Sequence, residues 1–237
     1  MKTSKLSLIA SLGILLFISC SKKENDLISQ NCQSDCTEIV GRIMTDNATV
    51  PIPNVKLTVK WKLFTSFIGG GTIRTKAITE TDSQGNFDLS FFIRDDEINE
   101  GTYHLEYEID ETTYIPGFHS RLEILELERN TSKNIYLNIP KKAFLNLTVL
   151  NLDDKNPGDY FSTDFSTEVP DGFKQSFNST AIGWGNQPSQ IKTIEIPANV
   201  PVKFNVVRKI NGVSTTVTET LLINAGATKS QTVDFNN

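Results

Sequence analysis

The sequence predicts an all-β protein made of two tandem β-sandwich domains. Apolar and polar residues alternate in many short runs, which is the period of a half-buried strand. Turn residues punctuate these runs, as in the Gly69-Gly70-Gly71 and Pro116-Gly117 stretches. No long segment has a convincing helical period, although residues 94–100 could form one turn. Short strands at turn-limited spacing are typical of sandwiches.

The chain begins with a short basic start and an apolar run from Leu6 to Ile18. This run is shorter than the about 20 apolar residues that span a bilayer as a helix. A basic start, a short apolar core and a small residue at its end are typical of a secretory leader. We therefore expect residues 1–19 to be a signal peptide.

Phe17-Ile18-Ser19-Cys20 resembles the lipobox of bacterial lipoproteins, with Phe17 where leucine is usual. The resemblance implies lipidation of Cys20, cleavage before it, and a membrane anchor of more than one acyl chain such as palmitate, which holds firmly. Ser21 at the next position implies sorting to the outer membrane, and residues 21–26 resemble the export tether of Bacteroidetes-type lipoproteins. The alternative is an ordinary leader followed by an incidental cysteine.

Residues 20–36 are polar and without period, which predicts a flexible lipidated tether. Cys32 and Cys36 lie at its end. Disulfides persist in the oxidising envelope, so we expect these two cysteines to pair. Zinc is the alternative, but two thiolates without a nearby histidine make half a site.

Charge argues against one class of partner. Removing residues 1–19 takes away Lys2 and Lys5, so the net charge changes from −5 to −7. An acidic chain with scattered lysines lacks the basic patch that phosphate backbones require, so no nucleic-acid partner is expected.

The first half begins near Glu38. Val55, Leu57, Val59 and Trp61 should share one strand face, and Tyr103, Leu105, Tyr107 and Ile109 another. Ordered motifs at residues 41–46, 51–57, 79–87 and 101–103 resemble the carboxypeptidase regulatory-like domain. The resemblance implies a transthyretin-like sandwich over residues 37–139, with Gly41 at a close packing contact and a hairpin turn at Asp82–Gly85 before a buried Phe87.

Residues 140–237 form the predicted second sandwich. Asn211-Gly212 between two β-rich runs predicts a two-residue hairpin that sets Ile210 opposite Val213, Val206 opposite Val217 and Phe204 opposite Glu219, where a bulge would not be surprising. A last strand should span residues 232–235. Residues 151–190 are rich in polar residues and are expected to be long recognition loops.

Metal ligands and catalytic groups are weakly indicated. His104, Glu106 and Glu108 share a strand face and could bind a metal, but a solvated face is the favoured interpretation, as is an exposed loop for His119. Residues 95–97 and 153–159 offer only loose calcium alternatives. We predict no catalytic residue, no metal and no cofactor. A Lys–Asn crosslink, known in related adhesins, is improbable here because Lys56 and Lys60 should face solvent, away from Asn138.

Three aromatic residues are candidate ligand contacts. Trp184 between two glycines could stack on a sugar, and Phe64 and Phe67 before the triple glycine could form an apolar loop tip for a partner or a membrane. Burial in a core is the favoured alternative for each.

Together these features predict a lipid-anchored envelope protein at the outer membrane, facing the periplasm or the cell surface, that acts as a non-catalytic binding or scaffolding module. Its partners would be the membrane, through the anchor, and a glycan or envelope protein. The alternatives are a subunit of a surface uptake or pilus-like assembly, favoured by an exposed edge strand, and a carbohydrate-active enzyme, favoured by a buried carboxylate pair.

Overall fold

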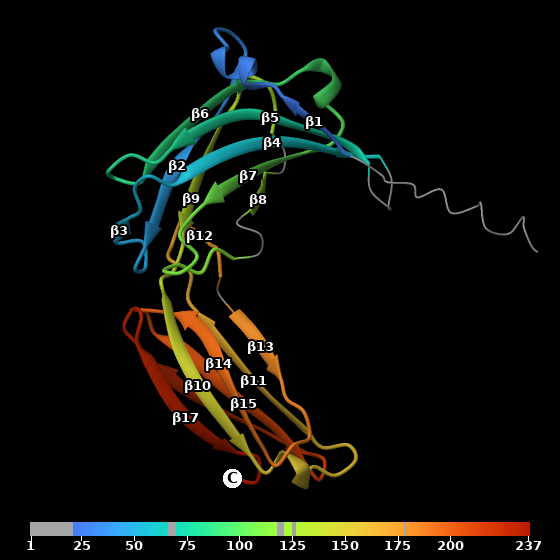
Figure 1. Ribbon diagram of the computed structural model, residues 1–237, viewed down its shortest axis with the longest axis vertical. Coiled ribbons are helices and arrows are strands. Elements are labelled where there is room, and N and C mark those ends of the chain that lie inside the picture. Colours follow the sequence, from blue (N-terminus) through green and yellow to red (C-terminus); the bar gives the residue numbers. More distant parts are fainter. Residues whose placement is uncertain (1–20, 66–69, 118–120, 125–126, 178) are drawn as a thin grey trace, which may run out of the picture.

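The computed structural model describes residues 21–65, 70–117, 121–124, 127–177 and 179–237, and of residues 121–124 only the backbone. Within these residues the protein is built from strands and short 3-10 helices, arranged as two β-sandwiches end to end (Figure 1). The all-β prediction is confirmed. None of the described helices is long and apolar enough to cross a membrane.

The first sandwich packs two sheets against each other. One sheet has the order β1-β5-β4-β7-β8. The other has the order β12-β9-β2-β3, with β6 paired to β2. The strands are β1 (Lys22–Asn25), β2 (Cys36–Thr45), β3 (Val50–Pro51), β4 (Lys56–Phe64), β5 (Gly71–Glu80), β6 (Asn86–Phe92), β7 (Thr102–Glu108), β8 (Arg121–Ile124), β9 (Ser132–Asn138) and β12 (Lys174–Gln175).

The core of the first sandwich follows the predicted alternation. The apolar faces of β4 and β7 are buried, including Trp61, Leu105 and Tyr107. Gly41 on β2 lies so close to β9 that a Cβ atom would stand 1.8 Å from the carbonyl oxygen of Ile135. The expectation of close packing at this glycine is confirmed.

The turn before β6 forms as its residues indicate. Asp82 accepts hydrogen bonds from the backbone N–H groups of Gln84 and Asn86, both at 2.8 Å. Gly85 adopts φ 76°, a value that glycine takes without a Cβ penalty. Phe87 is buried immediately afterwards.

The second sandwich also has two sheets, ordered β14-β10-β17 and β13-β11-β15-β16. Its apolar core is separate from the first and includes Leu145, Phe165 and Phe204. The strands are β10 (Lys142–Leu150), β11 (Tyr160–Thr167), β13 (Ser179–Gly183), β14 (Ser189–Pro197), β15 (Val202–Ile210), β16 (Val213–Leu221) and β17 (Thr228–Asp234). The register of the β15–β16 hairpin is the predicted one, and it runs through Phe204 and Glu219 without a bulge.

The expectation that residues 151–190 are long loops is wrong. This stretch holds η4 (Leu152–Asp154), β11, β12, β13 and the start of β14. In β11 the residues Phe161, Thr163 and Phe165 alternate inward and are buried. The serine and threonine residues of this stretch resemble the composition of a loop. Both side chains nevertheless fit the pleated, half-buried surface of a strand.

The two sandwiches are joined by more than the covalent chain. β12 comes from the second half of the sequence but pairs in parallel with β9 of the first sandwich. Asp46 accepts hydrogen bonds from Lys141 at 2.8 Å and from Asn199 at 3.0 Å. Ser176 donates a hydrogen bond to the carbonyl oxygen of Ile115 at 2.8 Å. These contacts fix the neighbouring ends of the two sandwiches.

Candidate functional site

The segment that follows Cys20 is folded onto the first sandwich. β1 pairs in parallel with β5, from Lys22 opposite Thr72 to Asn25 opposite Thr75. The backbone N–H of Asp26 continues the ladder by donating to the carbonyl oxygen of Thr75 at 2.9 Å. The helix η1 (Leu27–Asn31) then contacts β5 and β6. The prediction of a flexible tether is therefore wrong for residues 22–31, where Glu24, Asp26 and Gln30 have partners on β5.

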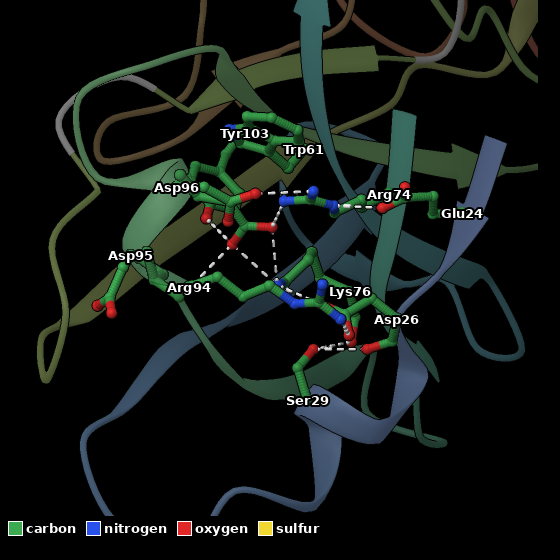
Figure 2. Close-up of polar contacts among 12 residues, drawn as sticks. Glu24, Asp26, Ser29, Trp61, Arg74, Lys76, Arg94, Asp95, Asp96 and Tyr103 are labelled. Atoms are coloured by element: carbon green, nitrogen blue, oxygen red, sulfur yellow. Dashed lines mark hydrogen bonds and ion pairs between the residues drawn. The ribbon is translucent and has the colours of Figure 1, made fainter. Parts of the chain in front are cut away.

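Lys76 of β5 forms the centre of a buried ionic cluster (Figure 2). Its Nζ lies 2.5 Å from Oδ2 of Asp26 and 2.8 Å from Oε2 of Glu97. The three side chains are at most 2% exposed. An isolated charge in such a place would cost several kcal/mol, which is why buried charges are found paired.

Both acids also bind other groups of the protein. Arg94 contacts Oδ1 of Asp26, and its backbone N–H donates to Oε2 of Glu97 at 2.9 Å. The hydroxyl of Tyr103 donates to the same Glu97 oxygen at 2.9 Å. Burial, first of all, and then the neighbouring Glu97 charge raise the pKa of Tyr103, which keeps its hydroxyl a donor.

Arg74 extends the cluster toward β1. It binds Glu24 of β1 at 2.5 Å and Asp96 of η2 (Asp95–Glu97) at 2.8 Å, and its guanidinium lies 4.7 Å from the ring centroid of Trp61. Hydrogen bonds from Lys22 and then Arg74 lower the pKa of Glu24 to about 2. The hydrogen bond to Asp96 contributes most to the raised pKa of Arg74.

The local sequence pattern does not indicate that Lys76 is buried. The pairing of β4 with β5 shifts between Val59 opposite Ala77 and Lys60 opposite Thr75, which leaves Lys76 as the extra residue of a β-bulge. A bulge re-aims a side chain relative to the strand alternation. Strict alternation therefore cannot assign a face to Lys76.

The buried acids do not form a paired-acid catalytic site. Asp26 and Glu97 both bind Lys76 directly and are at most 2% exposed, so their oxygens are occupied by groups of the protein. Asp26 borders a surface hollow lined also by Ile28 and Phe92, but Glu97 does not line it. The two buried carboxylates are thus held in a structural ionic cluster with Lys76.

Three cysteines belong to this part of the sequence. Cys32 and Cys36 are joined by a disulfide that closes the loop before β2. Cys20 lies outside the described residues, one position before Ser21. The structure thus describes the chain from the residue immediately after the predicted lipid attachment point.

Trp184 is partly buried against the second core. Its indole N–H donates to the hydroxyl of Thr163 at 3.0 Å, and its ring meets Phe161 edge-on at 6.4 Å between centroids. Lys192 Nζ lies 4.6 Å from the ring centroid. A sugar stacking on that face would have to displace Lys192.

Phe64 is exposed at the end of β4, with 61% of its surface accessible. Phe67 and His119 lie outside the described residues, so the predicted loop tip is described only at its start.

His104 is buried, with 3% of its surface accessible, so the expectation of a solvated face is wrong there. It lies opposite Lys60 on β4 and opposite Glu123 on β8, and the hydroxyl of Thr102 is 2.9 Å from its Nε2. β7 lies between β4 and β8, and residues of both neighbouring strands flank the His104 side chain.

No group of three or more metal-binding side chains exists among the described residues. Two acids proposed beside His104 are paired instead, Glu106 with Lys60 and Lys62, and Glu108 with Lys56. At residues 95–97, where a calcium site was the alternative, Asp95 is bound instead by the guanidinium of Arg129 at 2.6 Å. At residues 153–159, Asp159 accepts hydrogen bonds from the backbone N–H groups of Asn156 and Asn211, which lower its pKa.

Asn138 lies on β9, in a different sheet from Lys56 and Lys60 of β4. Its amide donates to Gln175 at 2.9 Å and its oxygen accepts from the backbone N–H of Ala48 at 3.0 Å. Both lysines pair with glutamates of β7. The two lysine side chains are 42% and 31% exposed, on the side of β4 that the alternation predicts to face solvent.

Comparisons with known proteins place the chain in no family. No family model matches the sequence, and no curated protein matches it. Among solved structures, the D295N mutant of the shaft pilin SpaA from Lactobacillus rhamnosus GG is similar over 81% of this chain and 96% of that chain, with 11% identity and a TM-score of 0.33. A DUF3823 family protein from Parabacteroides merdae is similar over 78% and 98%, with 11% identity and a TM-score of 0.28.

A putative cell adhesion protein from Bacteroides fragilis is similar over 77% of this chain and 80% of that chain, with 13% identity and a TM-score of 0.27. Likenesses at these TM-scores carry no argument about function. The functional proposal must therefore depend on the chain itself.

Proposed function

We propose that the mature protein is a lipid-anchored, non-catalytic module of the outer membrane, with Cys20 as the lipidated residue. The leader and the lipobox resemblance support the anchor. The observation that carries the proposal is the attachment of β1 to β5, which begins two residues after Cys20. The lipid would then be linked almost directly to a folded domain.

The ionic cluster gives this attachment its strength. Glu24 and Asp26 follow Cys20 closely, and they bind Arg74 and Lys76 of β5. Pulling the anchor would therefore load the β1–β5 ladder and the cluster together. We infer that the first sandwich is held close to the membrane surface and that residues 140–237 form the distal sandwich that meets partners.

A labelling experiment tests the anchor. The full chain, expressed in a Gram-negative host with radiolabelled palmitate, should carry label and fractionate with membranes. Cys20→Ser should lose both, whereas the double variant Cys32→Ser/Cys36→Ser should keep the label. Label that persists in Cys20→Ser, or a wild-type chain without label, would overturn the proposal.

A second candidate function is that of a subunit in a surface assembly. It is favoured by β16, the last strand of its sheet, whose residues from Val213 to Thr220 are exposed. A glycan-binding role for Trp184 remains a proposal that a glycan array with Trp184→Ala as control would test. Binding by the wild type but not by the variant would support it, and no bound glycan would remove it.

A further inference from the structure

β16 extends beyond the sheet that should cover it. Val213 and Val217 lie opposite Ile210 and Val206, so they share the core-facing side of β15. Val206 is 5% exposed, yet Val213 and Val217 are 66% and 54% exposed. The facing sheet has three strands where this sheet has four. Two valines on the core-facing side are thus left in solvent.

The free edge of β16 also carries unpaired backbone groups. Asn211-Gly212 closes a two-residue hairpin, so Ile210 and Val213 exchange both of their backbone hydrogen bonds. Because such pairs alternate along an antiparallel ladder, the N–H and C=O groups of the even-numbered residues point away from β15. These residues are Ser214, Thr216, Thr218 and Thr220. Within the described chain no other strand pairs with this edge.

The edge lacks the usual protection against strand pairing. Exposed edges are commonly guarded by lysine, proline or an uncompensated inward charge. β16 has neither lysine nor proline. Its one charged residue, Glu219, is bound by Lys229 at 3.2 Å and by Gln231 at 2.6 Å, both on β17. The remaining residues are serine, threonine, valine and leucine, which suit a strand.

We propose that β16 pairs antiparallel with β16 of a second copy of this chain, about a two-fold axis at Val217. This register makes hydrogen-bonded pairs of Thr216 with Thr218 of the second copy and of Ser214 with Thr220, all through the outward groups. On the core-facing side Val217 meets Val217, and Val213 meets Leu221. Threonine pairs and apolar pairs stabilise neighbouring strands. Glu219 lies opposite Thr215, so no like charges meet.

Neighbouring registers are poorer. An axis at Thr216 sets Val213 against Glu219, and an axis at Thr218 sets Val217 against Glu219. An axis between two residues would oppose outward groups with inward ones and would lose the hydrogen bonds. The two-fold pairing closes on itself, so it produces a dimer and not a filament. It goes beyond the proposed anchor and does not depend on it.

Engineered cysteines test the register in the mature chain made soluble by Cys20→Ser. At the axis the Cα atoms of the two Val217 residues would be about 4.5 Å apart, as in a non-hydrogen-bonded pair. Val217→Cys should therefore form a disulfide-linked dimer under mild oxidation, since disulfides join Cα atoms up to about 7 Å apart. Val213→Cys is the matched control, because Val213 is at least as exposed as Val217 but would lie roughly 27 Å from its own copy, at about 3.4 Å per residue.

A backbone variant tests the pairing without a crosslink. The N–H of Thr216 points away from β15, so Thr216→Pro leaves the β15–β16 ladder intact and blocks only the free edge. Sedimentation of the soluble chain should show a dimer that Thr216→Pro shifts to a monomer and that Thr216→Val retains. Should Thr216→Pro fail to fold, the two cysteine variants still decide.

Two results would overturn the proposed dimer. One is a soluble wild-type chain that sediments as a monomer at every protein concentration measured. The other is equal disulfide crosslinking of Val217→Cys and Val213→Cys. Neither result would bear on palmitate labelling of Cys20, so failure of the dimer and failure of the anchor are distinguishable.

Discussion

The two sandwiches differ in how their sheet edges are closed. In the first, β1 covers the edge of β5, and the Asp26–Lys76–Glu97 cluster locks that cover in place. In the second, β16 ends its sheet, and no strand of the described chain pairs beyond it. The comparison teaches that a short segment before the first sandwich can cover a sheet edge, and that among the described residues the second sandwich has no equivalent at β16. The buried ionic cluster is therefore a feature of the first sandwich, and the strand edge open to pairing is a feature of the second.

The largest expected effect comes from breaking the buried cluster. Lys76→Ala leaves two buried carboxylates without their shared cation and should destabilise the first sandwich by about 3–5 kcal/mol. Lys203→Ala, which removes an exposed pair with Glu168 at 3.4 Å, should cost less than about 1 kcal/mol. Urea unfolding followed by circular dichroism measures both. Equal effects would show that the cluster does not hold the first sandwich together.

A pair of glycines sharpens the comparison of packing. Gly41→Ala would place a Cβ 1.8 Å from the carbonyl oxygen of Ile135 and should cost about 1–3 kcal/mol through forced backbone shifts. Gly183→Ala in β13 meets nothing within 4 Å and should be neutral or stabilise by up to about 1 kcal/mol. Thermal unfolding of the two variants checks this. A neutral Gly41→Ala would contradict the tight β2–β9 contact.

Acid should loosen the edge cover of the first sandwich. The pKa of Glu24 is lowered from 4.5 to about 2 by Lys22 and then Arg74. A lowered folded-state pKa means that Glu24 stabilises the β1–β5 contact above about pH 4.5 and that this contribution is lost as the pH falls toward about 2. The protection factor of the Asp26 amide against hydrogen exchange should fall across that window, because its N–H bonds Thr75.

Two variants make the acid experiment decisive. Glu24→Gln should remove the pH dependence of the protection of the Asp26 amide against hydrogen exchange. Asp110→Asn should leave it unchanged, although hydrogen bonds from Thr112 and Thr113 also lower the pKa of Asp110 to about 2, because this residue lies in the turn after β7. The same acid response in both variants would exclude Glu24 as its source.

The smallest expected effect is on covalent mass. Condensation of Lys76 with Asp26 would join Nζ to Cγ and release one water. It would also remove the Lys76 charge that compensates buried Glu97, which is unfavourable in a low-dielectric interior. Intact mass spectrometry of the reduced soluble chain should therefore match the sequence. A mass lower by one water that is restored in Lys76→Arg would show that the cluster is a crosslink.

Local pattern predicted much of the fold because alternation and turn residues act over a few positions. The register of the β15–β16 hairpin follows from Asn211-Gly212 alone, and the buried faces of β4 and β7 follow from period two. The same method failed at residues 151–190, because Thr163 and its polar neighbours resemble loop residues until the pairing of β11 with β13 and β15 is known.

By itself, the sequence determined the all-β class, the hairpin at Asn211-Gly212 and the resemblance of the N-terminus to a lipoprotein leader. Only the tertiary structure decided that Lys76 is buried, that residues 22–31 belong to the first sandwich and that Val217 is exposed on a core-facing side. The reason is physical. Each of these outcomes depends on contacts between residues far apart in the sequence: a β-bulge, a parallel pairing across fifty residues and a missing covering strand. A local sequence pattern therefore cannot predict them.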